Sequence, residues 1–543
     1  MLFAASTLAL SACKKNNTQP TPTPTPTPTP VTPTPVTPTN ATRQQLTLDS
    51  IFLYAKEIYY WNDRLPSYDV FNPRQYTSAA SNAASYTAAL NAIARYSNPF
   101  EWTSTSTSPK YSYIFDKVNK NPVALINPVS SVDLEGNGND LGIRFGLYGS
   151  ENDYAIYVTA VYQNSPAEAQ GFVRGDLVKK INGQSFGTNY SGEVGALNNA
   201  LNGTSVTLEG IKADGTTSFN KSVTKGVFKS SPIYKTKVIT AGAKKIGYLA
   251  YARFSNKENS ETALSNAFST FSSSGVTDLV IDLRYNGGGY ISTAEHLINL
   301  IAPSTASGTM FTEYYNSTMK NNQAVILQNQ PLLDGNGKVQ YFNNQIVNYY
   351  NYRSNPYSEA NNTSYFSKKG SLNSVRNIVF LVSSSTASAS ELVINSLKPH
   401  MNVKLVGRTT YGKPIGFFPV TIENKYDIYF SMFETKNSAG DGGYFSGMVP
   451  DFSLYELTEI RNPSGTLTGY TMVDFGDVND TYLKKALDIL APGVTVTNDR
   501  TTMSTSSVKT TSKNIVSSSN VINAEFADKE FKGMVENRFR LRN

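Results

Sequence analysis

Apolar runs and amphipathic stretches alternate through the second half of the chain. Four runs are nearly continuous in apolar residues, namely 246–254 (IGYLAYARF), 276–285 (VTDLVIDLRY), 375–382 (VRNIVFLV) and 402–407 (NVKLVG). Two stretches between them follow helical spacing, namely 260–275 and 290–302. Strands that are apolar on both faces alternate with helices in sheets that are covered on both sides. The pattern predicts an α/β core over residues 231–492.

Two different patterns precede this core. Residues 44–98 place apolar side chains near 3.6-residue spacing, which predicts a small helical domain over residues 44–130. Residues 131–230 contain short strands and turns, which predict a β-rich module. Within it, Ser165-Pro166-Ala167-Glu168 has the pattern of a helix start, and Asn182-Gly183 is typical of a tight hairpin turn. The predicted fold class is therefore a multidomain α/β protein with an additional all-β module.

The two ends of the chain differ in composition from the segments between them. Residues 1–13 are short, small and apolar and end in Leu10-Ser11-Ala12-Cys13, which resembles a bacterial lipoprotein signal with Cys13 as the lipidated residue. Residues 14–43 hold a Pro-Thr repeat, which favours an extended polyproline tether. Residues 493–543 are expected to form a Ser/Thr linker and an amphipathic tail. These features predict a lipoprotein of the cell envelope, anchored to the membrane by lipid and facing the periplasm or the cell exterior.

Composition narrows the classes of function. The 48 basic and 41 acidic residues leave a net charge of +7, but no block of like charges stands out, so a nucleic-acid partner is not expected. Cys13 is the only cysteine. An internal disulfide, a redox pair and a metal site built from several cysteines are therefore excluded.

A cluster of hydroxyl side chains opens a helical pattern at 386–397 (TASASELVINSL). Serine and threonine are common helix caps, but a serine at such a turn is also a candidate nucleophile. A catalytic serine needs a base. The chain offers His296 and His400, or a lysine whose pKa is lowered by burial, for which Lys413 in TTYGKPIG is the candidate.

These blocks closely resemble the C-terminal processing peptidases, also called tail-specific proteases. Ser388-Ala389-Ser390-Glu391 matches their nucleophile motif, and Tyr411-Gly412-Lys413, with Lys413 25 residues after Ser388, matches their lysine turn. The glycine turn in 282–289 (DLRYNGGG) and the segment 440–451 (GDGGYFSGMVPD) match further blocks, so that the resemblance covers about residues 44–490. It implies a crotonase/ClpP-like α/β catalytic core.

The resemblance also implies the roles of individual residues. Ser388 is the expected nucleophile and Lys413 the expected base of a Ser-Lys dyad. The N–H groups of Gly288 and Ala389 are the expected oxyanion hole. Glu391 is either a residue that favours the helix start or a polar support of the site, and both interpretations stay open.

The β-rich module resembles a circularly permuted bacterial PDZ domain. The matching residues are LGIRF at 141–145, NSPAEAQGFVRGDLV at 164–178 and ING at 181–183. Leu141, Gly142 and Ile143 correspond to the family's carboxylate-binding loop, where backbone N–H groups hold the C-terminus of a peptide that adds as a strand. The alternative is a module that folds in this way without a ligand.

The sequence departs from the family at Phe417. Many members carry a glutamine there, four residues after the lysine, which orients the amine; this favours a plain Ser-Lys dyad. The leading hypothesis is a serine endopeptidase that cleaves exported polypeptides with accessible C-termini and needs no metal or organic cofactor. The alternatives are a catalytically degenerate PDZ scaffold and a surface glycan-binding lipoprotein.

Overall fold

The computed structural model describes residues 40–78, 80–118, 132–334, 337–373, 375–497, 522–524 and 533–535. The described residues from Arg43 onward belong to one compact unit. The predicted signal, the lipid attachment at Cys13 and nearly all of the Pro/Thr tether lie outside the described residues, as does most of the Ser/Thr linker. Within the described ranges, no helix has both the length and the apolar character needed to cross a membrane.

Six strands form the central sheet of the core. Their order is β10 (Ile233–Ala241), β11 (Lys244–Tyr251), β12 (Asp278–Asp282), β18 (Asn377–Val382), β19 (Asn402–Gly407) and β24 (Phe452–Ser453). β10 and β11 pair antiparallel, and every later pair is parallel. Each of the four apolar runs of the sequence supplies one of these strands, as predicted.

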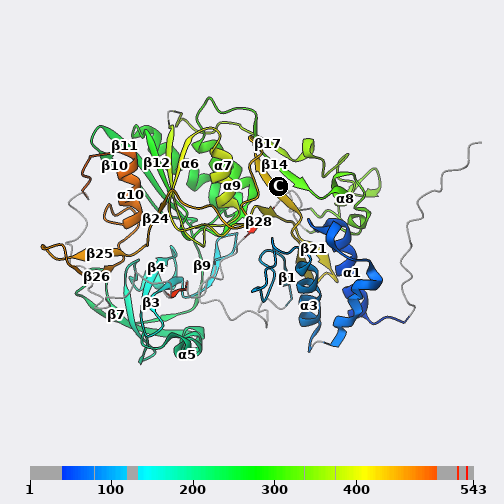
Figure 1. Cartoon of the computed structure of the whole chain (residues 1–543), viewed down its shortest axis with the longest axis horizontal. Coiled ribbons are helices and arrows are strands. Elements are labelled where there is room, and N and C mark those ends of the chain that lie inside the picture. Colours follow the sequence, from blue (N-terminus) through cyan, green and yellow to red (C-terminus); the bar gives the residue numbers. More distant parts are fainter. Residues whose placement is uncertain are drawn as a thin grey trace, which may run out of the picture. The chain divides into compact units, whose positions relative to one another are not determined.

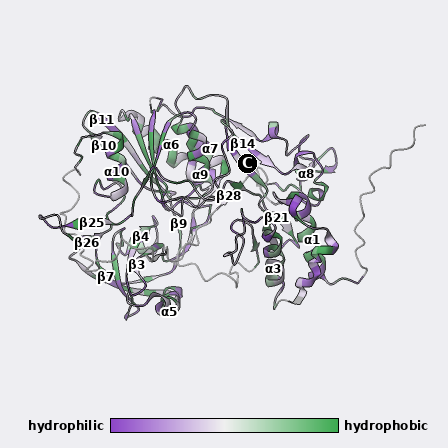
Figure 2. Ribbon diagram, viewed as in Figure 1, coloured by the Kyte–Doolittle hydropathy of each residue, from purple (hydrophilic) through white to green (hydrophobic). Residues whose placement is uncertain are grey.

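Helices cover both faces of this sheet (Figure 1). On one face lie α6 (Lys257–Ser273), α7 (Ile291–Ile301) and α9 (Ala389–Leu397), which share a core with strand residues such as Leu279 and Phe380. On the other lies α10 (Thr481–Leu490), which packs with the neighbouring residues Val280 and Val379. Successive strand side chains point to opposite faces, so an unbroken apolar run serves both layers. In Figure 2, α7 and α9 are coloured mainly as hydrophobic.

Two smaller sheets lie outside the central sheet. One has the order β17 (Thr363–Tyr365), β14 (Thr309–Tyr315), β23 (Phe433–Asn437) and β20 (Ile415–Gly416). The other joins β1 (Tyr113–Asp116), β22 (Tyr426–Tyr429) and β21 (Val420–Ile422). The Asn- and Tyr-rich stretch 320–370 contributes Leu327, Tyr349 and Tyr357 to the main core. Its sequence therefore contains buried core residues although its hydrophobic periodicity is weak.

The N-terminal helices belong to the same hydrophobic core as the central sheet. α1 (Arg43–Ile58) and α3 (Asn82–Arg95) pack on each other, with the single turn α2 (Tyr68–Phe71) between them in sequence. Buried residues of α1 such as Ile51 join the core cluster that includes Leu279. The predicted helices are present, and they are continuous with the core by packing.

The β-rich module forms one sheet with two helices. Its order is β27 (Ile522–Ala524), β3 (Ile143–Ser150), β4 (Asp153–Val161), β5 (Leu177–Ile181), β7 (Ser205–Ile211) and β8 (Ser218–Thr224), and β6 (Gln184–Ser185) pairs with β5. A further pair joins β2 (Asn137–Asp140) to β9 (Gly226–Lys229). The helices are α4 (Pro166–Ala169) and α5 (Tyr190–Asn202). As predicted, the Ser165 hydroxyl caps α4 and Asn182-Gly183 closes the β5–β6 turn with positive φ at both residues.

A buried charge network joins this module to the core. Arg174 donates to Glu456 at 2.7 Å and to the hydroxyl of Tyr285 at 2.7 Å. Arg284 forms a two-bond pair with Asp480, at 2.8 and 2.9 Å. Because Tyr285 stands next to Asn286 and the glycine turn, the network ties the module to a strand end of the core.

Candidate active site

Ser388 lies on a sharp turn between a strand and a helix. β18 ends at Val382 and α9 begins at Ala389. Ser388 has φ of 59° and ψ of −109°, a conformation that residues with a Cβ rarely adopt. Such strain costs about 1–3 kcal/mol and is typical of a nucleophile turn that aims one side chain out of the backbone.

The other hydroxyls of the cluster are occupied by the backbone. Thr386 donates to the carbonyl of Leu283 at 2.7 Å, and Ser390 donates to the carbonyl of Asn286 at 3.0 Å. The buried hydroxyl of Ser388 has no hydrogen-bond partner in the part of the chain that the structure describes. Thr386 and Ser390 therefore fix the turn, and Ser388 is left for chemistry.

Lys413 occupies a second tight turn. Gly412 before it has φ of 81°, and a Cβ built there would lie 2.3 Å from the nitrogen of Gly447. Only glycine fits that close approach. The side chain of Lys413 is fully buried, with Nζ 4.1 Å from the ring centre of Phe417 and 5.6 Å from that of Tyr111. Phe417, at which the sequence departs from the family pattern, thus packs its aromatic ring against the Lys413 side chain.

Burial lowers the pKa of the Lys413 ammonium to about 7. Removal from water disfavours the charged form, and this cost outweighs the carboxylates of Glu101 and Glu391, which favour it. Lys110 lowers the pKa a little further. A substantial fraction of Lys413 is therefore a neutral amine at neutral pH, as a general base requires.

Glu391 joins the two turns. Its carboxylate, fully buried in the first turn of α9, accepts hydrogen bonds from the backbone of Ser388, Gly412 and Lys413, each at 2.8 Å, and from the hydroxyl of Thr410. Burial raises the pKa of this carboxyl above its ordinary value, and the four hydrogen bonds that it accepts make the rise smaller. Both interpretations of Glu391 describe real contacts, since it caps α9 and also supports the lysine turn.

The glycine turn reaches the nucleophile. Gly288 has φ of 110°, and a Cβ built there would lie 3.0 Å from Cβ of Ser388. Its N–H donates to Oδ1 of Asn286 at 2.9 Å. The N–H of Ala389 lies in the first turn of α9, where donors lack acceptors within the helix. The oxyanion roles of Gly288 and Ala389 stay predictions.

Neither histidine is hydrogen-bonded to the hydroxyl of Ser388, which has no such partner among the described residues. His296 bonds the hydroxyl of Ser265 through Nε2 at 3.1 Å. His400 bonds the hydroxyl of Ser438 at 3.1 Å. The arrangement therefore favours the lysine over a histidine as the base.

The predicted peptide loop of the module is a tight turn before β3. Gly142 has φ of 76°, and its N–H donates to the carboxylate of Asp140 at 2.7 Å. The carbonyls of Leu141 and Gly142 accept bonds from Ala167 and Tyr162. The loop thus already holds a carboxylate of its own chain, and the peptide-binding role of Leu141, Gly142 and Ile143 stays a prediction.

Two site residues come from the N-terminal part and carry no motif. Tyr111 donates its hydroxyl to the carbonyl of Gly412 at 2.7 Å, which supports the lysine turn. Glu101, also buried, contributes a negative charge near Lys413. Only the aromatic character of 111–115 (YSYIF) hinted that this stretch is buried.

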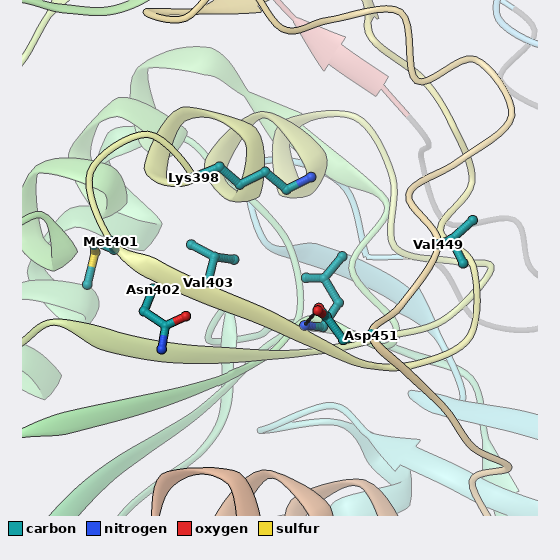
Figure 3. A pocket seen from close by; sticks show the side chains of 7 residues that line it. Lys398, Met401, Asn402, Val403, Val449 and Asp451 are labelled. Carbon is teal, nitrogen blue, oxygen red and sulfur yellow. Dashed lines mark hydrogen bonds between the residues drawn. The ribbon is translucent and has the colours of Figure 1, made fainter.

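An open cavity lies elsewhere on the core. A pocket of about 400 Å³ lies at the end of α9 and along β19. Figure 3 shows the side chains that line it. Its lining consists of Lys398, Met401, Asn402, Val403, Leu405, Val449 and Asp451. Lys404 and Asp451 pair beside it at 2.9 Å. None of the candidate catalytic residues lines this pocket.

Comparisons with known proteins agree with this architecture. Residues 245–454 match the model of peptidase family S41, and residues 157–209 match a PDZ domain. The carboxy-terminal processing protease CtpA of Bacillus subtilis is 25% identical over 49% of this chain and 46% of its own length. A carboxyl-terminal-processing protease of Synechocystis is 21% identical over 67% of this chain and 71% of its own length. The chain spans about half the length of the Bacillus subtilis relative and of matched Staphylococcus aureus proteins.

A solved structure supports the fold. A putative S41 protease from Bacteroides fragilis superposes with a TM-score of 0.51 at 21% identity, over 82% of this chain and 96% of that one. The predicted fold class, with N-terminal helices, a PDZ domain and an α/β core, is confirmed.

The fold is that of a solved S41 protease, and the chain is similar to serine peptidases and to PDZ domains. Residues 245–454 are thus similar to peptidase family S41, and the curated relatives that match are named as C-terminal processing proteases. Neither the degenerate scaffold nor the glycan-binding lipoprotein is favoured by these matches.

Proposed function

We propose that the protein is a serine endopeptidase with a Ser388–Lys413 dyad. One observation carries the proposal: the backbone nitrogens of both residues lie 2.8 Å from the same oxygen of Glu391, and both side chains are fully buried. A neutral amine within hydrogen-bond reach of a serine hydroxyl can act as its base.

The chemistry follows from the two groups. Neutral Lys413 takes the proton of the Ser388 hydroxyl as its oxygen attacks the scissile carbonyl carbon. The ammonium then gives this proton to the leaving amine, and an acyl-enzyme forms. Water, deprotonated by the same amine, then attacks the ester carbonyl. The bond to the Ser388 oxygen breaks, the ammonium returns the proton to that oxygen, and the peptide leaves with a new C-terminal carboxyl group. No step requires a metal or an organic cofactor.

Backbone donors would hold the tetrahedral oxyanion. We assign this to the N–H of Ala389 and to an N–H of the glycine turn, with Gly288 as the candidate. Each such donor is typically worth about 3 kcal/mol of the barrier. For Gly288 to donate, its present bond to Asn286 must be given up when substrate binds.

The test compares three variants on an unfolded protein such as casein. Ser388→Ala and Lys413→Met should each reduce kcat by at least about a thousandfold, because either change removes the dyad. Ser384→Ala, an exposed serine of the same turn, is the matched control and should retain activity. Equal turnover in all three would refute the dyad.

For substrates, we propose exported polypeptides whose C-termini are accessible. In the PDZ domain, a substrate strand would add at the edge of β3, which β27 occupies in this structure, and its terminal carboxylate would bind at the loop Leu141-Gly142-Ile143. Peptides with a free C-terminus should bind more tightly than the same peptides amidated there. Equal affinity for both forms would exclude recognition of the carboxylate.

We also propose that Cys13 carries a lipid and that the protein is held in the cell envelope by the Pro/Thr tether. The sequence Leu10-Ser11-Ala12-Cys13 supports this. Cys13→Ser should move the protein from the membrane fraction to the soluble fraction and abolish incorporation of a labelled fatty acid. Labelling that survives the substitution would contradict the anchor.

A further inference from the structure

The C-terminal tail of the chain enters the candidate active site as a strand. β28 (Gly533–Val535), which is labelled in Figure 1, pairs parallel with β13 (Gly288–Tyr290), the strand formed by the glycine turn. The N–H of Gly533 donates to the carbonyl of Gly287 at 3.1 Å. An extended segment that pairs in this way is bound through its backbone, as peptides are in strand addition.

The lysine side of the site holds the same strand. The N–H of Phe417 donates to the carbonyl of Met534 at 3.1 Å, and Phe417 forms a parallel bridge with Val535. The tail therefore lies between the glycine turn and the segment that follows Lys413.

The tail also passes the nucleophile at close range. The Cβ position built on Gly288 lies 2.5 Å from the carbonyl oxygen of Gly533 and 3.0 Å from Cβ of Ser388. Two groups that both lie this near one point are themselves neighbours. The peptide carbonyl of Gly533 is thus the substrate-like group beside Ser388.

The side chains of the strand are accommodated as well as its backbone. Met534 is fully buried, and Val535 packs against Tyr290, Phe417 and Tyr429. Burying such a side chain typically stabilises the bound state by about 1.5–3 kcal/mol. The site accepts a small residue followed by two apolar ones.

An earlier part of the same tail adds to the PDZ domain. β27 pairs antiparallel with β3, with Ile522 opposite Gly149 and Ala524 opposite Leu147. The chain direction of β27 leads toward the start of β3, where the loop around Gly142 lies. Two segments of one tail therefore occupy the two strand-addition edges that a substrate would need.

We propose that this tail is an internal competitor of the substrate, and that Gly533-Met534-Val535 marks the site where an extended substrate with apolar residues binds. The inference rests on the proposed function, because it takes the cleft beside Ser388 as the peptide site. A tethered segment acts at an effective concentration of about 1 mM. If the tail alone bound with a dissociation constant of about 0.1 mM, it would weaken the apparent binding of a free peptide to the site about tenfold.

The test measures binding to the full chain carrying Ser388→Ala, which removes turnover. The probe is a fluorescent peptide with the sequence of residues 530–539, EFKGMVENRF. Adding Met534→Asp should expel the tail and tighten peptide binding about tenfold, because a carboxylate is costly in that buried position. Met534→Leu, which keeps an apolar side chain of similar size, should leave the affinity near that of the parent.

Val535→Asp is a second expelling variant, in case Met534→Asp lowers the yield of folded protein. Val227→Asp, at a side chain that is 82% exposed on β9, controls for the added charge and should not change binding. Equal affinity of the parent and both expelling variants, or no peptide binding to any of them, would overturn the inference.

The two proposals fail in different ways. If the protein with Ser388 intact does not cleave casein but Met534→Asp still tightens peptide binding, the peptidase proposal fails and the competing tail stands. If casein is cleaved but neither expelling variant tightens peptide binding, only the tail inference fails.

Discussion

The backbone N–H groups of Ser388 and Lys413 donate to one atom, Oε2 of Glu391, and each nitrogen lies 2.8 Å from it. The other oxygen, Oε1, accepts from the backbone of Gly412 at 2.8 Å and from the hydroxyl of Thr410. A single buried carboxylate therefore sets the position of the nucleophile turn relative to the lysine turn. Glu391 acts as a positioning residue, since it acts through backbone groups.

Removing that carboxylate should loosen both turns. Glu391→Ala leaves three buried backbone donors without an acceptor, at about 1–3 kcal/mol each, and we expect it to lower the free energy of unfolding by several kcal/mol. Glu391→Gln keeps one acceptor oxygen and should be milder. Urea unfolding measures both, with Ser384→Ala as the neutral control. A urea midpoint of Glu391→Ala equal to that of the parent would contradict the role.

Activity should depend on pH through Lys413. The amine must be neutral to act as a base, and the pKa of Lys413 is about 7, so kcat/KM should rise as pH increases through about 7 and then level off. A profile that is flat from pH 6 to 9, or one that falls with rising pH, would exclude this amine as the base.

The same lowered pKa affects stability with a definite sign. In the unfolded chain Lys413 keeps its proton up to about pH 10.4, whereas in the folded chain it releases the proton near pH 7. Below pH 7 the buried charge therefore lowers the free energy of unfolding by its full amount. This destabilisation fades as pH rises from 7 to about 10. Lys413→Met should therefore be more stable than the parent at pH 6, with a smaller difference at pH 10. Thermal unfolding at the two pH values measures it, and an unchanged difference would contradict the burial of a charge.

The sequence predicts those parts of the molecule whose causes are local. The strands β12 (DLVID) and β18 (NIVFLV) are centred on short apolar runs, and Ser388 and Lys413 stand in short motifs with a fixed separation. The positive φ of Ser388 could not be read from its residue type, because serine rarely adopts it and the surrounding bonds impose it.

Contacts between distant segments could not be predicted in this way. Glu101 and Tyr111 reach Lys413 only because the N-terminal helices pack on the core, and nothing in their own stretch marks a site. The tail strand Gly533–Val535 is similarly short, and its pairing depends on an edge formed by the glycine turn. Local periodicity carries no information about which remote edge a three-residue strand joins.

Phe417 should set the pKa of the neighbouring lysine. Its buried ring lies 4.1 Å from Nζ of Lys413 and keeps water from that side. Phe417→Ala opens a cavity, typically at a cost of about 3–5 kcal/mol in stability, and admits water, so the pKa of Lys413 should rise toward its ordinary value. The midpoint of the pH–activity profile should then move up by about one unit or more. Phe417→Leu is the matched control, and equal midpoints in all three proteins would show that the ring does not govern the amine.

The junction between the PDZ domain and the core should depend on Glu456. Burial opposes ionisation of this carboxyl, but Arg174 and Arg284 outweigh it and lower its pKa to about 2. A depressed carboxyl pKa contributes stability that is complete above about pH 4.5 and is lost as pH falls through about 2. Glu456→Gln leaves two buried guanidinium groups short of a partner, so we expect a loss of about 3–5 kcal/mol at pH 7. Glu459→Gln, which removes an exposed partner of Arg461, is the matched control and should cost less than about 1 kcal/mol. Urea unfolding at pH 7 and pH 3 measures the free energy of unfolding of both variants. The loss caused by Glu456→Gln should be smaller at pH 3 than at pH 7. A loss at pH 7 as small as that of Glu459→Gln would show that this network does not hold the two parts together.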